Sequence, residues 1–282
     1  MKIALGTVQF GIPYGINNTN GVPARNEIKN IFRLANAYGI SILDTAPAYG
    51  DAEIKIGELS NSKFKVVTKF SYANSEIELR SQLSKSLQDL GTSNVYGYLA
   101  HNAENLIKVP ELWRVLSEAR DEKLIKKIGY SLYDPEQLDM LLSNGLIPDL
   151  VQIPYSLLDR KFETALSILK NLGAEIHVRS VFLQGLYFKN PNELPFKLAP
   201  LKSQLVDLQK LCKMHSLSIG ALALNFVVQN LNVDQVVIGV EKESQLKQNL
   251  EMIQTLENQN GLMEEIGKLV VSNKNLLNPA NW

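Results

Sequence analysis

The sequence predicts a single (β/α)8 barrel, or TIM barrel, that extends over residues 1–282 as one domain. Eight short apolar runs alternate with longer segments in which apolar residues recur every three or four positions, the pattern of parallel strands joined by outer helices. The length of 282 residues is usual for one such barrel. Polar residues able to do chemistry stand at the ends of several apolar runs, where barrels of this kind hold their active sites.

The predicted strands are short. They cover 3–6, 40–43, 65–68, 95–100, 125–131, 150–153, 175–180 and 236–238. The predicted helices cover 25–38, 52–60, 75–90, a segment after Pro110, a segment from Asp134-Pro135, 162–172, 202–214 and 218–230. Gly39 and Gly91 end two of these helices, and Asp51 is expected to cap the helix that starts at Ala52. An extra helix therefore lies between the seventh and eighth strands.

Composition excludes several kinds of partner. Lys and Arg together number 29, as do Asp and Glu, so the formal net charge of zero provides no general attraction to nucleic acid or to anionic membranes. The single cysteine, Cys212, cannot form an internal disulfide, and no Cys/His cluster has the spacing of a metal site. No segment is predicted to be a signal peptide or a membrane span. We expect a cytoplasmic protein, monomeric or a small homo-oligomer, that acts on a small molecule.

Asp44, Tyr49, Lys69 and His101 stand at three consecutive strand ends. Asp44 and Tyr49 follow the second strand, Lys69 ends the third and His101 follows the fourth. A phenol alone is a poor proton donor at neutral pH because its reference pKa is about 10. An ammonium at ~4 Å, in an effective dielectric near 20, favours the phenolate by roughly 4 kcal/mol, or about three pKa units. We therefore expect Lys69 to bring the pKa of Tyr49 towards neutrality.

These four residues and their contexts resemble the catalytic tetrad of the aldo-keto reductases. Asp44 and Tyr49 lie in Leu-Asp-Thr-Ala-Pro-Ala-Tyr-Gly, Lys69 ends Val-Val-Thr-Lys, and His101 begins the His-Asn pair after Leu-Ala. The resemblance continues through residues 128–131, 151–155, 180–185 and 238–249, and covers nearly the whole chain. It implies reduction of an aldehyde or ketone, a sugar among the possibilities, to an alcohol by hydride from a nicotinamide.

The resemblance implies a role for each member of the tetrad. Tyr49 donates a proton to the carbonyl oxygen as general acid, and Lys69 lowers its pKa. Asp44 holds the Lys69 ammonium in place. His101 donates to the same carbonyl oxygen and orients it.

The resemblance also implies a site for NADP(H) along the strand ends, although the chain has no GxGxxG motif. Ser131 and Gln152 match positions that hold the carboxamide, and residues 180–185 match the pyrophosphate loop. Arg179 stands where a Tyr often stacks on the nicotinamide; a guanidinium can stack likewise, or can meet an anionic substrate group. The predicted cofactor-binding residues are Gly6, Thr7, Ser131, Gln152, Arg179, Ser180, Leu183, Gln184, Gly185, Gly239, Glu241, Lys242, Gln245, Gln248 and Asn249.

Residues after the eighth strand decide which cofactor is expected. Gln248 and Asn249 match adenine-binding positions, and Gln245 falls near the expected 2′-phosphate. Lys242 can pair with that phosphate, whereas the carboxylates of Glu241 and Glu243 would repel it. On this basis we expect NADPH in preference to NADH.

The substrate pocket is expected to be walled by aromatic and polar residues, which suit sugars as well as aromatic aldehydes. In the family the C-terminal segment lines this pocket, so the tail after Asn275 is expected near it. The predicted pocket residues are Val8, Gln9, Phe10, Tyr14, Tyr72, Tyr155 and Trp282, with Trp113 as a further candidate. Two other functions remain open: a regulatory protein on the same barrel that binds cofactor with little turnover, and a metal-dependent hydrolase or lyase that uses Asp44 and His101.

Overall fold

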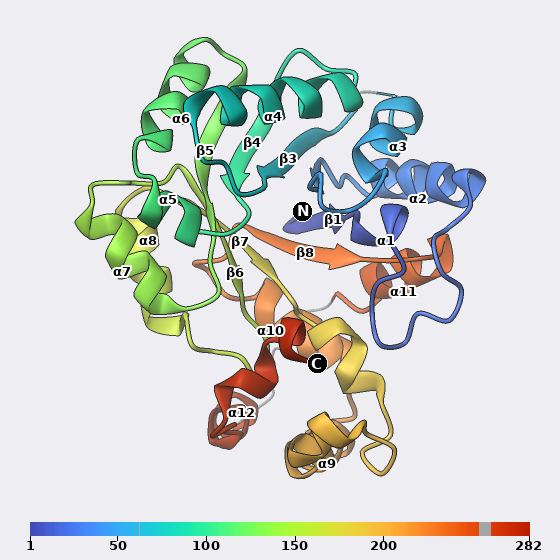
Figure 1. Ribbon diagram of the computed structural model, residues 1–282. Helices are drawn as coiled ribbons and strands as arrows, with labels where there is room; N and C mark the ends of the chain where they lie inside the picture. The colour runs from blue at the N-terminus through green and yellow to red at the C-terminus, as the bar shows by residue number, and fades with distance from the viewer. Residues whose placement is uncertain (62, 254–260) are drawn as a thin grey trace.

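The computed structural model describes residues 1–61, 63–253 and 261–282. Eight parallel strands follow one another around a closed barrel in sequence order, and the last pairs with the first (Figure 1). The strands are β1 (Ile3–Gly6), β2 (Ile42–Asp44), β3 (Lys65–Phe70), β4 (Val95–Ala100), β5 (Ile125–Ser131), β6 (Leu150–Pro154), β7 (Glu175–Arg179) and β8 (Gln235–Gly239). The predicted fold class is confirmed, and each strand lies within about two residues of its expected place.

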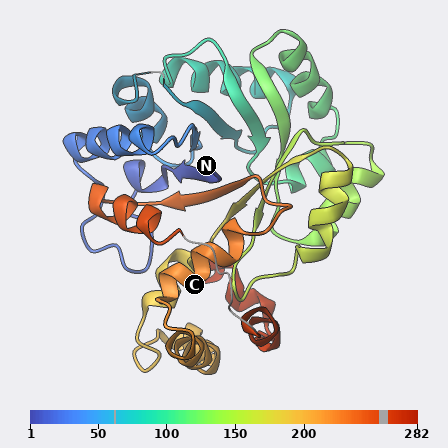
Figure 2. The same cartoon turned by 180° about the vertical axis from the view of Figure 1, so that it is seen from behind.

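Helices cover the outside of the barrel (Figures 1 and 2). The α-helices are α1 (Val8–Gly11), α2 (Arg25–Ala37), α3 (Ala52–Leu59), α4 (Glu76–Asp89), α5 (Glu104–Lys108), α6 (Leu112–Asp121), α7 (Pro135–Ser143), α8 (Glu163–Asn171), α9 (Lys202–Met214), α10 (Ile219–Val228), α11 (Glu243–Glu251) and α12 (Leu262–Lys268). The 3-10 helices are η1 (Leu183–Phe188), η2 (Phe196–Leu201), η3 (Lys274–Leu277) and η4 (Pro279–Asn281). The predicted extra helix is α9, which projects from the barrel together with α12 (Figure 1).

Two apolar clusters result from the alternation of side chains along each strand. The larger one contains Leu5 and Leu43 together with helix residues such as Ile28 and Ile31, so it fills the layer between strands and helices. The smaller one consists of strand residues alone: Ala4, Ile42, Val67, Leu99 and Leu150. It fills the barrel interior, as expected for a barrel that is a packed core and not a pore.

Helix ends are set by short-range chemistry, in most cases as the sequence predicts. Gly39 and Gly91 follow α2 and α4 with φ of 75° and 60°, conformations that glycine adopts without steric cost. The prediction for Asp51 is wrong. Its side chain makes no cap bond to α3 and instead pairs with Lys55 at 2.7 Å.

The C-terminal segment is held against the barrel by Arg160. Its guanidinium donates to the main-chain oxygens of Ile266, Gly267 and Leu269 at 2.6–3.2 Å, where α12 ends. In the described part of the chain no single helix is both long and apolar enough to cross a membrane. One pair, 196–214 with 219–228, passes that test only jointly and is bent by 90°.

Candidate active site

A cavity of about 810 Å³ opens at the carboxyl ends of the strands. Its wall includes the last residues of five strands, namely Gly6, Asp44, Ser131, Arg179 and Gly239. This is the end of a (β/α)8 barrel at which catalytic groups gather, because loops from all eight strands converge there.

Asp44 and Lys69 form a buried ion pair at the base of the cavity. The Nζ atom of Lys69 lies 2.6 Å and 2.5 Å from the two carboxylate oxygens of Asp44, and it also donates to the main-chain oxygen of Thr45 at 2.9 Å. Lys69 is fully buried and Asp44 is 3% exposed. The amide of Gln152 donates to Asp44 Oδ1 at 2.8 Å. These contacts fix the ammonium in one place, since its three protons have three acceptors.

Tyr49 and His101 lie above this pair. Their rings meet edge to face with centroids 5.7 Å apart, and the Lys69 Nζ lies 5.3 Å from the centre of the Tyr49 ring. Both Tyr49 and His101 border the cavity. The four side chains expected to form the tetrad therefore lie together, and all of them except Lys69 border the cavity.

Two glycines allow the segment that carries Tyr49 to approach the first helix. A Cβ atom on Gly11 of α1 would stand 1.6 Å from the main-chain oxygen of Tyr49, which no side chain can occupy. A Cβ atom on Gly50, whose φ is 62°, would stand 2.6 Å from the main-chain oxygen of Gly11. The backbones of α1 and the turn before α3 are thus in direct contact, and this contact places the Tyr49 ring.

Burial determines the protonation of the site. Desolvation, followed by the charge of Asp44, raises the pKa of Tyr49 well above its usual value, so Tyr49 is a neutral phenol at pH 7. The expectation that the pKa of Tyr49 lies near neutrality is therefore wrong for this structure, because burial and the charge of Asp44 raise it. Desolvation, followed by the nearby Lys69, lowers the pKa of His101 to about 4, so this imidazole is neutral as well.

The comparison with family models identifies the chain. The model of the aldo/keto reductase family matches residues 2–268. The chain belongs to the aldo/keto reductase family.

Individual relatives are distant but align over most of their length. The NADH-specific methylglyoxal reductase of Escherichia coli (strain K12) is 25% identical over 88% of this chain and 88% of its own. The L-glyceraldehyde 3-phosphate reductase of the same strain is 23% identical over 90% of this chain and 86% of its own. The holo form of an aldo-keto reductase from Bacillus halodurans superposes with a TM-score of 0.79 at 19% identity, covering 96% of this chain and 94% of that one. That structural likeness confirms the fold.

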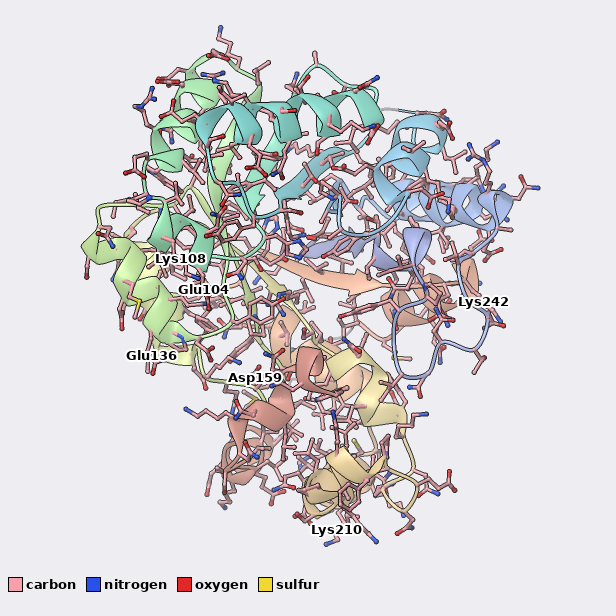
Figure 3. The ribbon with its side chains drawn as sticks, viewed as in Figure 1. Glu104, Lys108, Glu136, Asp159, Lys210 and Lys242 are labelled. Atoms are coloured by element: carbon pink, nitrogen blue, oxygen red, sulfur yellow. The ribbon has the colours of Figure 1, made fainter. Side chains whose placement is uncertain are left out.

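Most of the residues expected to bind cofactor in this aldo/keto reductase border the cavity. They are Gly6, Thr7, Ser131, Gln152, Arg179, Ser180, Gln184, Gly185, Gly239, Glu241, Gln245, Gln248 and Asn249. Two do not. Leu183 is fully buried in the apolar core. Lys242 is exposed and outside the cavity wall, and Figure 3 labels it beside α11 at the edge of the molecule.

The loop after β7 has a backbone suited to an anion. Ser180, Leu183, Gln184 and Gly185 have φ of 64°, 43°, 52° and 92°. Left-handed residues next to right-handed ones gather main-chain N–H groups into a concave site for phosphate oxygens. The segment before α2 closes over this loop (Figure 1): Asn17 Nδ2 donates to the Gly185 oxygen at 2.7 Å, and Gln184 Nε2 donates to the Tyr14 hydroxyl at 2.6 Å. Within the loop, Leu183 and Gly185 already donate their N–H groups to the main-chain oxygens of Ser180 and Phe182 at 2.9 Å.

The predicted substrate pocket is corrected at several positions. Val8, Gln9 and Tyr14 border the cavity, whereas the other four predicted aromatic residues do not, namely Phe10, Tyr72, Tyr155 and Trp282. Phe10 packs edge to face on Phe32 of α2, and Tyr155 stacks on Phe226 of α10, so both rings belong to the layer outside the strands. Tyr72 is 44% exposed.

The C-terminal tail reaches the cavity through other residues than its tryptophan. Asn278 and Pro279 border the cavity, while the Trp282 indole donates to the Leu276 oxygen at 2.9 Å. Trp113, the further candidate, packs against Tyr130 and also lies outside the cavity wall.

Sequence reasoning missed several cavity residues. They include Asn17, Tyr133, Phe182, Phe188, Met252 and Asn278. Of these, Tyr133 could have been predicted from the sequence, because it follows Ser131 by two residues at the end of the fifth strand. Among the described residues, no group of three His, Cys, Asp or Glu side chains is placed to hold a metal ion.

Proposed function

We propose that this aldo/keto reductase uses a nicotinamide cofactor to reduce an aldehyde or ketone, with Tyr49 as the proton donor. The observation that supports this most directly is the placement of Tyr49 and His101 side by side on the cavity wall, with the Asp44–Lys69 pair buried behind them. The cofactor, when bound, supplies the hydride that no side chain can supply.

The side chains have distinct roles in this proposal. The raised pKa of Tyr49 keeps its proton available at neutral pH, so the hydroxyl can give it to the carbonyl oxygen. The Lys69 ammonium, 5.3 Å from the ring centre, favours the phenolate left behind. Neutral His101 offers an N–H to the same oxygen and fixes its direction. Asp44 keeps Lys69 in position.

The charges near β8 favour NADH, in contrast to the NADPH expected from sequence. Lys242 lies outside the cavity wall, whereas Glu241 is part of it. The first N–H of α11, that of Glu243, is already bound by the Glu27 carboxylate at 2.6 Å. A 2′-phosphate would therefore meet carboxylates. A free ribose 2′-hydroxyl suits such a position, because a carboxylate accepts its hydrogen bond.

The role of Tyr49 is tested by Tyr49→Phe, which removes the donor and keeps the ring. Turnover is expected to fall by about 10²–10⁴, the usual contribution of a general acid, while NADH binding measured by fluorescence persists. Tyr72→Phe is the matched control, because Tyr72 is exposed and does not border the cavity. Wild-type turnover in Tyr49→Phe would assign the proton to another group. Binding of cofactor without turnover of any aldehyde, ketone or sugar by the wild type would favour the regulatory function.

The cofactor preference is tested with Glu241→Gln. The ratio of kcat/KM with NADH to that with NADPH is expected to fall by roughly 10–100-fold, the worth of one hydrogen bond to a charged group. Lys242→Ala is expected to leave that ratio within about threefold, since a lone exposed charge contributes little. A selective loss of NADPH use in Lys242→Ala, with no effect of Glu241→Gln, would restore the original expectation.

A further inference from the structure

Arg179 is the one side chain with a permanent positive charge among the described residues of the cavity wall. The carboxylate nearest the reaction centre, Asp44, is already neutralised by Lys69. The other acidic wall residue, Glu241, follows β8 and is engaged by Asn20 and Gln245. The charge of Arg179 lowers the pKa values of Tyr49 and Tyr14 against the effect of burial. It lowers the pKa of His101 in the same direction as burial does. The reaction centre is thus electropositive.

The guanidinium of Arg179 is held in place without a carboxylate partner in the described chain. Its central carbon lies 4.4 Å from the centre of the Tyr133 ring. Nη2 donates to the main-chain oxygen of Leu132 at 3.1 Å, and Nη1 lies 3.4 Å from the Ser180 hydroxyl. A guanidinium has five N–H donors, so several remain for a ligand.

The other arginines are placed differently. Those that form ion pairs with Asp or Glu side chains are Arg25, Arg33, Arg80, Arg114 and Arg120. Arg160 instead binds three main-chain oxygens at the end of α12. Arg179 alone among them faces a cavity, with its plane fixed by an aromatic ring and most of its donors unused.

We propose that Arg179 binds an anionic group of the carbonyl substrate, a carboxylate or a phosphate close to the reacting carbon. A planar guanidinium fork matches two oxygens of either group, and the Tyr133 ring fixes the fork in advance, which reduces the entropy lost on binding. The substrate class is then anionic carbonyl compounds, such as oxo acids or phosphorylated aldehydes. This inference rests on the proposed reductase function and narrows it.

Matched substrate pairs test the proposal. Succinic semialdehyde is compared with butanal, and glyceraldehyde 3-phosphate with glyceraldehyde, each at saturating cofactor, to separate carboxylate from phosphate. In the wild type kcat/KM is expected to favour the anionic member of at least one pair by about tenfold or more. Arg179→Met should reduce this ratio by at least about tenfold, and Arg179→Lys should retain part of it because the charge remains. Arg114→Met, a surface control paired with Glu76 and Glu118, should keep the wild-type ratio.

The outcomes separate this inference from the function on which it rests. A wild-type enzyme that reduces neutral and anionic members equally well would overturn the inference and leave the reductase function intact. Weaker cofactor binding in Arg179→Met with an unchanged ratio would assign Arg179 to the cofactor and also overturn it. If no carbonyl compound is reduced, the proposed function fails. The inference about Arg179 is then tested by calorimetry, in which inorganic phosphate or succinate is titrated into the cofactor-loaded protein. Binding that is lost in Arg179→Met supports the inference, and equal or no binding in both proteins overturns it.

Discussion

His101 shows how burial at the scale of one residue sets both chemistry and stability. Its ring meets the Tyr49 ring edge to face. Its pKa is lowered from 6.5 to about 4, by desolvation first and by Lys69 second. At neutral pH the ring is therefore uncharged, and the positive charge on the cavity wall comes from Arg179. In the unfolded chain the same residue is solvated and takes up a proton near its ordinary pKa.

This difference predicts a pH dependence of stability. Between pH 6.5 and about 4 the unfolded chain binds the His101 proton and the folded chain does not, so stability from this group is present above pH 6.5 and lost as the pH falls. The loss amounts to about 3 kcal/mol at most, at about 1.4 kcal/mol per pKa unit. The free energy of unfolding, measured by urea denaturation between pH 7 and pH 4, should fall more steeply with decreasing pH for the wild type than for His101→Asn. Parallel curves would show that His101 titrates normally in the folded protein.

Among the elements, the short helix α1 lies directly against the turn that carries Tyr49 and limits how far that turn can move. Gly11 is the last residue of α1, and its missing side chain lets the Tyr49 main chain lie directly against it. Lys55 of α3 donates to the Phe10 oxygen at 2.7 Å and holds the same pair of segments together. The position of the Tyr49 phenol thus depends on a backbone contact.

Gly11→Ala should disturb this contact. The added methyl group would overlap the Tyr49 oxygen, so we expect a loss of about 1–3 kcal/mol of stability, typical of overpacking, together with lower kcat. Thermal unfolding and steady-state kinetics measure both. Gly267→Ala is the control, because a Cβ on Gly267 in α12 meets no atom within 4 Å. Unchanged stability and kcat in Gly11→Ala would mean that the two segments separate without cost.

At the scale of the whole molecule, the two ends of the barrel have different tasks. The carboxyl ends of the strands carry the cavity, whereas the amino ends carry a network around Glu175. Burial opposes ionisation there, but hydrogen bonds from His177 at 2.7 Å, Lys127 at 2.5 Å and Tyr96 at 2.6 Å keep the pKa of Glu175 at about 2. This network ties β4, β5 and β7 together away from the chemistry.

Glu175→Gln should therefore affect stability without affecting the site. We expect a loss of about 1.5–3 kcal/mol, the value of a hydrogen bond to a charged group, and an unchanged Kd for cofactor. The control is Glu104→Gln, which removes an exposed pair with Lys108 on α5 (Figure 3) and should cost at most about 0.5 kcal/mol. Altered cofactor binding in Glu175→Gln would show that the two ends are coupled.

The barrel and the residues at its strand ends can be predicted from the pattern of the sequence. Runs such as 95–100 and 236–238 are apolar and short, and they recur with helical segments between them, so the strands could be placed to within about two residues. Because parallel strands end at one rim, residues that end neighbouring strands must meet. Asp44, Lys69 and His101 are predicted from that geometry together with the family resemblance.

Only the tertiary structure decided which side chains border the cavity. Phe10 and Tyr155 are aromatic and close in sequence to cavity residues, yet their rings turn outward to Phe32 and Phe226, partners that lie on distant helices. The pKa of Tyr49 depends on its burial and on the nearby charges of Asp44 and Arg179, which sequence spacing does not reveal. Loop residues such as Lys242 follow no period, so their direction is set by packing between segments far apart in the chain. Local patterns specify elements, and contacts between elements specify the site.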